Sequence, residues 1–367
     1  MKTYRPLPST CRLLGRALLA AALIFGACGG CKRAPPPPPE PVAPPAPPKP
    51  RTLQAVQRWS VDVPGAAALC VGDWDGDQAA DILVADSTPK LIVLGARGNL
   101  KGSFPLPDRF TAIECGRHRD QGSRLLGYSG IGKEVRVLDN AGKELWSYPS
   151  STVVNGAHWG DLDGDGSDEL VVGMSGFGGI HAVSPDGKLI WQYKNIGDVW
   201  NLAVIPATPA RTALVYATES RGAIRELDGS GTRLRAFHPE NLFCAQLSAA
   251  VIDASNTVQV ITVGQAREGL VIAMDERGTN VWKMPCPTDR SAWRTTSFAS
   301  GDIDGDGVRE WAFLGAPGKL VIVTARGDAI ASVAIGENPC GFAIVPAADG
   351  SLLVTCDSDK IIAYAFE

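Results

Sequence analysis

The sequence predicts an all-β fold, a seven-bladed β-propeller spanning residues 51–367 with four antiparallel strands in each blade. The first observation is a hairpin motif, in which an apolar strand, a glycine turn and a strand often bearing tryptophan follow one another. Its turn glycines are Gly98, Gly142, Gly187, Gly231, Gly278 and Gly327, with spacings of 44, 45, 44, 47 and 49 residues. A period in the forties, with β-branched strands and no helical periodicity, is typical of one four-stranded blade per repeat.

The second observation is that the two ends of this region complement each other. The strand-like segment at 360–367 aligns with 90–93 and 319–322 but has no partner strand after it. Residues 57–61 resemble the fourth strand of other blades, such as 145–148. We therefore expect the N-terminal strand to complete the last blade and close the ring, which leaves only short, protected sheet edges. Six or eight blades would require one of these alignments to be accidental.

The third observation is an acidic loop that recurs in register with the hairpins. It reads GDWDGD at 72–77, GDLDGD at 160–165 and GDIDGD at 301–306. The first aspartate of each copy lies 25 or 26 residues before a turn glycine, so that both motifs belong to one blade. The first strand of such a blade leads into the acidic loop, and the second strand leaves it.

The chain begins with a predicted signal peptide at 1–27. Basic residues in the first 16 positions precede an unbroken run of eleven apolar residues at 17–27. This run is too short for a membrane-spanning helix, which needs about 20 residues. The small residues before Cys28 resemble a bacterial lipobox, in which the cysteine is lipidated. Because Phe25 stands where leucine is commoner, Cys31 is an alternative site, and cleavage without lipidation is a further alternative.

Residues 28–50 are expected to form a lipid-anchored, proline-rich linker. Between 34 and 50 the chain is almost wholly proline and alanine, a composition that cannot bury a core and favours extended polyproline II. At about 3.1 Å per residue, this stalk would hold the following domain roughly 50 Å from the membrane.

The acidic loops have the composition of calcium sites. Ca²⁺ takes about six to eight oxygen ligands, and carboxylates at alternate loop positions converge on one point when glycines let the chain turn sharply. Counting from the first aspartate, we expect side-chain ligands at positions one, three, five and nine and a carbonyl ligand at position seven. The expected ligands are Asp73, Asp75, Asp77, Ala79 and Asp81, then Asp161, Asp163, Asp165, Ser167 and Glu169, then Asp302, Asp304, Asp306, Val308 and Glu310. The sequence thus predicts up to three Ca²⁺ ions, and the alternative is solvated turns without an ion.

The matching positions of three other blades are poor in carboxylates. The second blade has Arg117, Arg119 and Gln121 there, and two cations would repel Ca²⁺. The fifth blade offers only Asp253 with two hydroxyl residues, and the fourth has no acid at 206–211. We expect no ion in these blades.

Six cysteines lie in the region predicted to be exported, where an oxidising compartment permits disulfides. We expect a Cys340–Cys356 disulfide, because Cys340 begins a strand, residues 346–350 form a turn and Cys356 ends the returning strand. In a regular antiparallel pairing these two cysteines come out opposite each other. Two further pairings stay open, Cys70 with Cys115 and Cys244 with Cys286.

The acidic loops resemble those of FG-GAP or VCBS-type repeats, the calcium-loop blades of integrin α-chain heads and of many bacterial exported proteins. The pattern Gly-Asp-x-Asp-Gly-Asp-Gly-x-x-Glu before an apolar strand carries the resemblance. The hairpins, as at 137–146, are also similar to quinoprotein-type propeller repeats, although the Thr-Gly pair of that family's tryptophan-docking motif is absent. Either family implies that four tryptophans pack between blades, namely Trp59, Trp146, Trp191 and Trp282.

No recognisable catalytic set accompanies these motifs. The four histidines lack metal-ligand spacing, and the serine strings at 127–130 and 173–176 lack the final glycine of a nucleophile elbow. His158 either faces the central channel or is a structural histidine. The basic run of Arg117, His118 and Arg119 is either part of a channel-mouth site or a solvated turn.

Two functional hypotheses follow. The first is a non-enzymatic, membrane-anchored binding or scaffold protein of the bacterial cell envelope, monomeric, with an envelope protein or a polysaccharide as its partner. Gly29 after Cys28 favours the outer membrane or the cell surface. The alternative is a propeller enzyme, either a calcium-dependent polysaccharide lyase or a quinone-dependent dehydrogenase. Nucleic acid is not an expected partner, because 35 basic against 39 acidic residues leave a formal net charge of −4.

Overall fold

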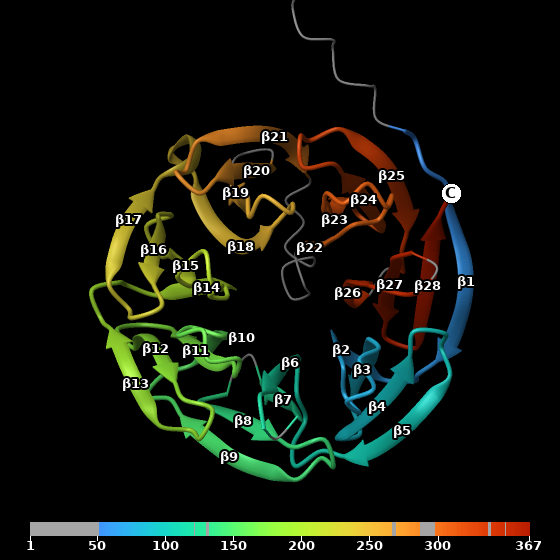
Figure 1. Cartoon of the computed structure of the whole chain (residues 1–367), viewed down its shortest axis with the longest axis horizontal. Helices are drawn as coiled ribbons and strands as arrows, with labels where there is room; N and C mark the ends of the chain where they lie inside the picture. The colour runs from blue at the N-terminus through green and yellow to red at the C-terminus, as the bar shows by residue number, and fades with distance from the viewer. Residues whose placement is uncertain are drawn as a thin grey trace, which may run out of the picture. The chain divides into compact units, whose positions relative to one another are not determined.

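A computed structural model describes residues 51–367 except 121, 130, 131, 266–268, 287–297, 337, 338 and 349. The predicted signal peptide and linker, with Cys28, lie outside the described residues. Residues Lys49–Glu367 form one compact unit, in which seven four-stranded antiparallel sheets are arranged in a ring (Figure 1). The first strands of the blades line a central channel. In the described part of the chain no helix has the length and apolar character needed to cross a membrane.

The first four blades follow one another along the chain. Blade 1 consists of β2 (Ala66–Gly72), β3 (Asp81–Asp86), β4 (Lys90–Gly95) and β5 (Leu100–Pro105). Blade 2 consists of β6 (Ala112–His118), β7 (Gly122–Tyr128), β8 (Glu134–Leu138) and β9 (Glu144–Pro149). Blade 3 consists of β10 (Val154–Gly160), β11 (Glu169–Met174), β12 (Gly179–Val183) and β13 (Leu189–Tyr193). Blade 4 consists of β14 (Val199–Ile205), β15 (Leu214–Glu219), β16 (Ile224–Asp228) and β17 (Arg233–Phe237).

The remaining blades complete the ring. A short 3₁₀ helix, Pro239–Asn241, leads into blade 5. Blade 5 consists of β18 (Phe243–Val251), β19 (Val258–Gln265), β20 (Gly269–Asp275) and β21 (Asn280–Cys286). Blade 6 consists of β22 (Phe298–Gly301), β23 (Glu310–Ala316), β24 (Lys319–Val323) and β25 (Ala329–Ala334). Blade 7 consists of β26 (Pro339–Val345), β27 (Leu352–Asp357), β28 (Lys360–Phe366) and β1 (Ala55–Asp62).

The N-terminal strand closes the ring. β1 pairs with β28 in antiparallel register from Ala55 opposite Phe366 to Asp62 opposite Lys360. The backbone of Gln54 exchanges hydrogen bonds with Glu367, and Arg58 pairs with the carboxylate of Glu367 at 2.8 Å. The predicted seven blades and the closure of the last blade by the first strand are therefore confirmed.

The middle strands of the blades form the core. Every residue of β3, β11 and β15 is buried, because neighbouring blades cover both faces of each middle strand. Apolar runs without alternation suit such two-sided burial. The fourth strands, by contrast, lie at the outer rim and are partly exposed, as the ring in Figure 1 shows.

Aromatic side chains of the fourth strands fasten most blades to the next one. At Gly187, whose φ is +81°, an ideal Cβ would lie 2.9 Å from Cδ2 of Trp146, so that only glycine leaves room for the indole. The indole Nε1 of Trp146 also donates to the carbonyl of Pro185 at 2.9 Å. The same packing of a ring on a turn glycine recurs for Trp59 on Gly98, Phe104 on Gly142, Trp191 on Gly231, Phe237 on Gly278 and Trp282 on Gly327. The predicted packing of the four tryptophans between blades is confirmed.

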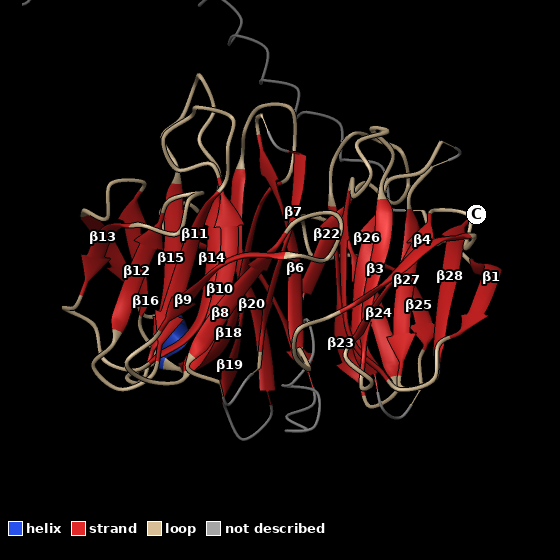
Figure 2. Cartoon of the chain, turned by 90° about the horizontal axis from the view of Figure 1, so that it is seen from below, coloured by secondary structure: helices blue, strands red, loops and turns tan. Residues whose placement is uncertain are grey.

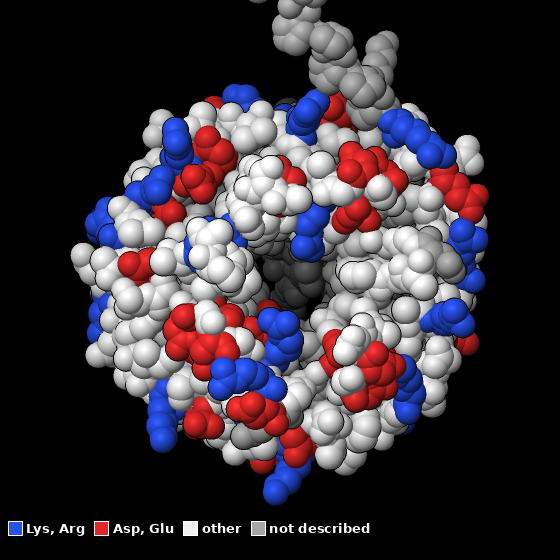
Figure 3. Space-filling model, in the orientation of Figure 1, with Lys and Arg blue, Asp and Glu red and all other residues white. Residues whose placement is uncertain are grey.

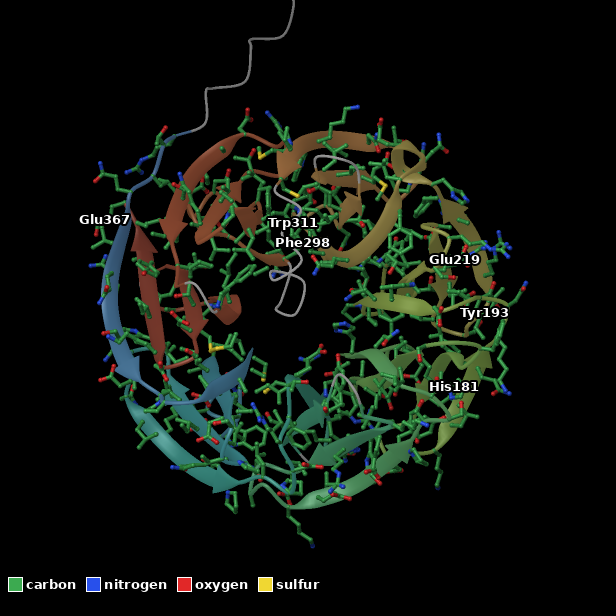
Figure 4. The ribbon with its side chains drawn as sticks, turned by 180° about the vertical axis from the view of Figure 1, so that it is seen from behind. His181, Tyr193, Glu219, Phe298, Trp311 and Glu367 are labelled. Carbon is green, nitrogen blue, oxygen red and sulfur yellow. A yellow bond between two sulfur atoms is a disulfide. The ribbon has the colours of Figure 1, made fainter. Side chains whose placement is uncertain are left out.

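The seam between blades 5 and 6 adds a buried hydrogen-bond chain. Trp311 donates to the side-chain carbonyl of Gln259 at 2.7 Å, and the amide of Gln259 donates to the carbonyl of Ala325 at 2.7 Å. The indole of Trp282 donates to the same carbonyl at 3.1 Å. Phe298, which lies beside Trp311 in Figure 4, packs edge-on against it with ring centroids 6.4 Å apart. The three side chains that donate in this hydrogen-bond network, those of Trp311, Gln259 and Trp282, therefore each have a buried acceptor, as burial requires.

Cys340 and Cys356 form a disulfide within blade 7, with Cα atoms 5.2 Å apart. The two residues are not directly opposite, because Gly341 pairs with Cys356 and a register shift places Cys340 in a bulge. The expectation of a regular pairing was wrong at this residue. The bulge still brings the two side chains together, since it turns Cys340 toward the neighbouring strand.

The other four described cysteines are free thiols. Cys244 and Cys286 lie on the first and fourth strands of blade 5, which are about 14 Å apart at the usual strand spacing. A disulfide needs Cα atoms within about 7 Å, so that this pairing does not fit the fold. The sulfur atoms of Cys70 and Cys115 face each other across the seam between blades 1 and 2 at 3.7 Å.

Candidate metal centres

The three acidic loops open on one face of the ring. We name them loop 1 (residues 73–81), loop 3 (161–169) and loop 6 (302–310), after their blades; each joins the first strand of its blade to the second. First strands all run in the same direction, so that these loops lie together on one of the two loop-bearing faces seen from the side in Figure 2. Figure 3 shows that face, with acidic patches spaced around the mouth of the channel.

Each loop is anchored by a buried apolar residue at its second position. Trp74, Leu162 and Ile303 are 3%, 7% and 6% exposed. The backbone N–H of each donates to the acid at position nine, at 3.2 Å in loop 1, 2.8 Å in loop 3 and 2.7 Å in loop 6. The ninth-position acids are buried as well, since they begin the second strand of each blade.

The remaining aspartates are oriented by the same backbone hydrogen bonds in all three loops. In loop 3 the Asp161 carboxylate accepts N–H bonds from Gly164 at 2.6 Å and Gly166 at 2.9 Å. Asp163 accepts from the N–H of Asp165 at 3.1 Å, and Asp165 accepts from that of Ser167 at 2.7 Å. Loops 1 and 6 repeat every one of these bonds. The carboxylates are thereby held before any ion binds.

This arrangement brings three carboxylates of each loop together. Within each group, oxygen atoms lie within 4.8 Å of one another. The groups are Asp73 with Asp75 and Asp81, Asp161 with Asp163 and Glu169, and Asp302 with Asp304 and Asp306. Asp77, Asp165 and Glu310 belong to the same loops but lie outside these closest groups, and the position-seven residues Ala79, Ser167 and Val308 are placed by their N–H bonds to position five. An all-oxygen donor set of this kind suits a hard cation such as Ca²⁺.

Among the described residues, no lysine or arginine forms an ion pair with a carboxylate of loop 3 or loop 6. Burial raises the pKa of Glu169 to about 7, and the negative charges of the aspartates in loop 3 add to the rise. The pKa of Glu310 is raised to about 7 by the same two causes. Burial and its neighbours also raise the pKa of Asp304. A divalent cation at either loop would offset this repulsion.

Loop 1 differs because a lysine of its own blade occupies it. Lys101 Nζ lies 2.9 Å from Asp75 Oδ2, 2.9 Å from Asp77 Oδ2 and 2.7 Å from Asp81 Oδ1. Burial alone would lower the pKa of Lys101, but the three carboxylates outweigh it and raise this pKa above its ordinary value. The hydrogen bond from Lys101, assisted by the N–H of Ala79, lowers the pKa of Asp77. Lys101 is 20 positions beyond Asp81 in the chain and lies outside the acidic motif, so that its role in loop 1 was not predicted from the sequence.

The loops also differ in how the preceding blade supports them. At position eight, the N–H of Asp168 in loop 3 donates to the carbonyl of Arg117 at 2.8 Å, and the N–H of Arg309 in loop 6 donates to that of Ile252 at 2.7 Å. Ala80, the matching residue of loop 1, makes no such bond to a residue that the structure describes. A groove of about 1130 Å³ instead runs beside loop 1, lined by residues of blades 7 and 1 such as Trp59 and Ala347.

The basic turn of blade 2 supports loop 3. The N–H of Arg117 donates to the carboxylate of Asp168 at 2.6 Å, and the guanidinium of Arg119 donates to the carbonyl of Asp165 at 3.0 Å. His118 accepts an N–H bond from Asp120 within the turn, at 3.2 Å. These contacts give the basic run a structural role that could not be read from its sequence, because loop 3 lies about 45 residues further along the chain.

His158 lines the central channel and forms an ion pair there. Its Nδ1 lies 2.9 Å from Glu114 Oε2 on β6, and both side chains border a channel cavity of about 420 Å³. Burial alone would lower the pKa of His158, but the charge of Glu114 and its hydrogen bond outweigh burial, so that the net shift is upward.

Solved structures share the propeller fold. BBS1N, crystallised in complex with ARL6DN, superimposes with a TM-score of 0.65 at 14% identity, covering 86% of this chain and 98% of that chain. BamB from Moraxella catarrhalis superimposes with a TM-score of 0.54 at 14% identity, covering 85% of this chain and 100% of that chain. No protein-family model matches the chain, and no curated protein matches it. At this level of identity the similarity establishes a β-propeller and no activity.

Proposed function

We propose that this protein is a non-enzymatic scaffold of the bacterial cell envelope, a rigid propeller that presents one face to a protein partner. Aromatic docking at the seams and closure by β1 make the ring a fixed platform. BBS1N was crystallised in complex with ARL6DN, an example of a propeller of this shape binding another protein. The fold alone does not select a partner, so that exposed side chains determine the binding surface.

The observation that carries the proposal is a group of aromatic residues on the face opposite the acidic loops. Phe177, between β11 and β12, is 87% exposed, and Trp200, at the start of β14, is 43% exposed. A hydrogen bond from the N–H of Gly176 to the carboxylate of Asp198 holds the two segments together. Phe243, at the start of β18, packs edge-on against Trp200 with centroids 5.3 Å apart. Two exposed aromatic residues from adjacent blades, backed by the half-buried Phe243 of the next blade, are typical of a protein-binding surface.

The test is crosslinking of the full-length protein in native membranes. A Phe177→Ser, Trp200→Ser double variant should lose the crosslinked partner, while its melting curve stays that of the wild type. Leu100→Ser is the matched control, because Leu100 is 65% exposed on β5 of the distant blade 1. An unchanged crosslink in the double variant, or equal loss in the control, would contradict the proposal.

We further propose that the acidic loops are of the FG-GAP or VCBS type and bind Ca²⁺ to stabilise the ring. The all-oxygen donor sets, the carboxylates held by backbone N–H bonds and the raised pKa values of Glu169 and Glu310 support this role. Metal analysis of the purified protein after dialysis against Ca²⁺ tests it directly. A protein without bound calcium would contradict it.

Export and lipidation at Cys28 complete the proposal. The apolar run at 17–27 and the proline-rich segment at 34–50 support an anchored domain on a stalk. Cells labelled with a fatty-acid analogue should yield labelled wild-type protein and Cys31→Ser variant but unlabelled Cys28→Ser variant. Label retained in Cys28→Ser would place the anchor elsewhere.

A further inference from the structure

Lys101 occupies a position that exists in every blade. In β5 the register shifts between Leu100 and Gly102, so that Lys101 is a bulge residue. The same shift recurs in the fourth strand of the other blades. The residues at this bulge are Arg58, Lys101, Leu145, Ile190, Leu234, Val281 and Ile330. In blades 3 and 6, which carry the other acidic loops, the bulge residue is therefore an uncharged isoleucine.

The contacts of Lys101 are those of a bound cation. Its Nζ lies 2.7 to 2.9 Å from three carboxylates, donating hydrogen bonds to Asp75 and Asp77 and forming an ion pair with Asp81, whose side chain is fully buried. Charge-assisted bonds of this length are among the strongest that side chains form. Arg58, the other basic bulge residue, pairs instead with Glu367 on the neighbouring strand, so that a basic residue at the bulge does not by itself reach a loop.

Two further differences set loop 1 apart. Its ninth residue is Asp81, one methylene shorter than Glu169 and Glu310, which withdraws the carboxylate and leaves space for the ammonium group. Its sixth residue is Gln78 with φ +66°, whereas loops 3 and 6 have glycine there. Loop 1 thus keeps the aspartates of the motif but departs from it at two positions besides the bulge.

We propose that the ammonium group of Lys101 is the resident cation of loop 1, so that loop 1 binds no divalent ion while loops 3 and 6 do. This inference rests on the proposed calcium sites and lowers their number from three to two. A Ca²⁺ ion at loop 1 would have to displace an ammonium group that already forms ion pairs with three carboxylates, one of them buried.

The test is the calcium stoichiometry of the full chain in detergent, measured by titration calorimetry and metal analysis. The wild type should bind two Ca²⁺ ions and Lys101→Met should bind three. Lys101→Arg and Ile190→Met are matched controls, since the first keeps the positive charge and the second changes the same bulge position in blade 3; both should bind two. A wild type that binds three ions would overturn this inference alone. A wild type that binds no ion would overturn both the calcium sites and the inference. Two ions in Lys101→Met would also overturn it.

A second variant keeps the inference testable should Lys101→Met fail to fold. The Asp161→Asn, Asp302→Asn double variant removes a carboxylate from the closest group of loop 3 and from that of loop 6, and it leaves loop 1 intact. It should bind no Ca²⁺, because Lys101 fills loop 1. One tightly bound ion in this variant would show that loop 1 accepts calcium and would contradict the proposal.

Discussion

Loop 1 and loop 3 hold their aspartates with the same backbone hydrogen bonds, yet only loop 1 places a lysine ammonium group among them. The consequence appears in the acids themselves. In loop 1 the pKa of Asp77 is lowered by Lys101, whereas in loop 3 burial and neighbouring charges raise the pKa of Glu169 to about 7.

The motif therefore determines the path of the backbone and not what fills the loop. The occupant depends on a residue of the fourth strand, which lies outside the motif, and on the preceding blade. Loop 3 is bonded to the turn of blade 2, while loop 1 borders a groove. The stability of a loop that supplies its own cation does not depend on the Ca²⁺ concentration, whereas the stability of a loop that binds an ion does.

Removal of calcium should lower the stability of the ring more than any single substitution described below, and it should act through loops 3 and 6. Each ion adds about 2.7 kcal/mol at a hundredfold excess over its Kd, so that two ions add about 5 kcal/mol. For a unit of this size, that corresponds to a rise of about 8 °C in Tm, measured by melting in chelator and in added Ca²⁺. The Asp161→Asn, Asp302→Asn double variant should melt at the same temperature in chelator and in added Ca²⁺. A wild type indifferent to the chelator would contradict this expectation.

Loss of the buried acid of loop 1 should come next. Asp81→Asn removes the closest and only buried partner of Lys101 and should cost about 2 kcal/mol, the usual size of a lost interaction with a charged group, since Asp75 and Asp77 still pair with the ammonium group. The cost should be equal in calcium and in chelator, as denaturant unfolding would show. Glu169→Gln is the matched change in loop 3, and its cost should appear only in calcium. Calcium dependence of the Asp81→Asn effect would mean that loop 1 binds an ion.

Substitutions at the sixth loop position should change the free energy of unfolding less, and by different amounts in loops 1 and 3. Gly166 has φ +91°, so that Gly166→Ala should cost about 1 to 2 kcal/mol through backbone strain. In Gln78→Gly, relief of strain and added freedom of the unfolded chain should nearly cancel, within about 0.5 kcal/mol. Chemical denaturation of the two variants in chelator separates these outcomes. Equal effects at the two positions would show that the loops do not differ in backbone strain.

The smallest contribution to stability should come from the His158–Glu114 ion pair, which lies on the strands that lead into the loops. His158 on β10 occupies the place of Cys70 on β2, and its pKa is raised by Glu114 against the effect of burial. The pair should therefore stabilise the fold fully below the unfolded pKa of about 6.5 and lose this contribution as pH rises through the higher folded value. NMR titration of the His158 ring should show a lower pKa in Glu114→Gln. An unchanged pKa would mean that the ion pair does not form in solution.

The repeat made the fold predictable from the sequence. Turn glycines such as Gly98 and Gly187 recur because an indole packs on each, and the end strands align because they share one blade. The anchoring of the acidic loops was also predictable, since their acids and glycines are contiguous. The calcium ions themselves remain a prediction.

The residues that the sequence did not reveal are those whose partners lie in another strand or blade. Lys101 reaches loop 1 from a bulge, and comparison of the seven bulge positions would have marked it as the charged exception near an acidic loop. The bulge at Cys340 and the pairing of Glu114 with His158 depend on register and on the packing of neighbouring blades. The spacing of residues along the chain does not reveal the strand register or the packing of neighbouring blades.

The closure of blade 7 also sets the order in which the molecule folds. β1 is made first and β28 last, and about 300 residues separate the partners that they bring together, so that this contact carries the largest loop-closure cost in the ring. Blades 1 to 6 are each local in the chain and can form as they emerge, whereas the ring is sealed only when synthesis of the final strand is complete. Until then β1 is an unpaired edge, and a chaperone or an inhibitory peptide that mimics β28 has its best opportunity to bind.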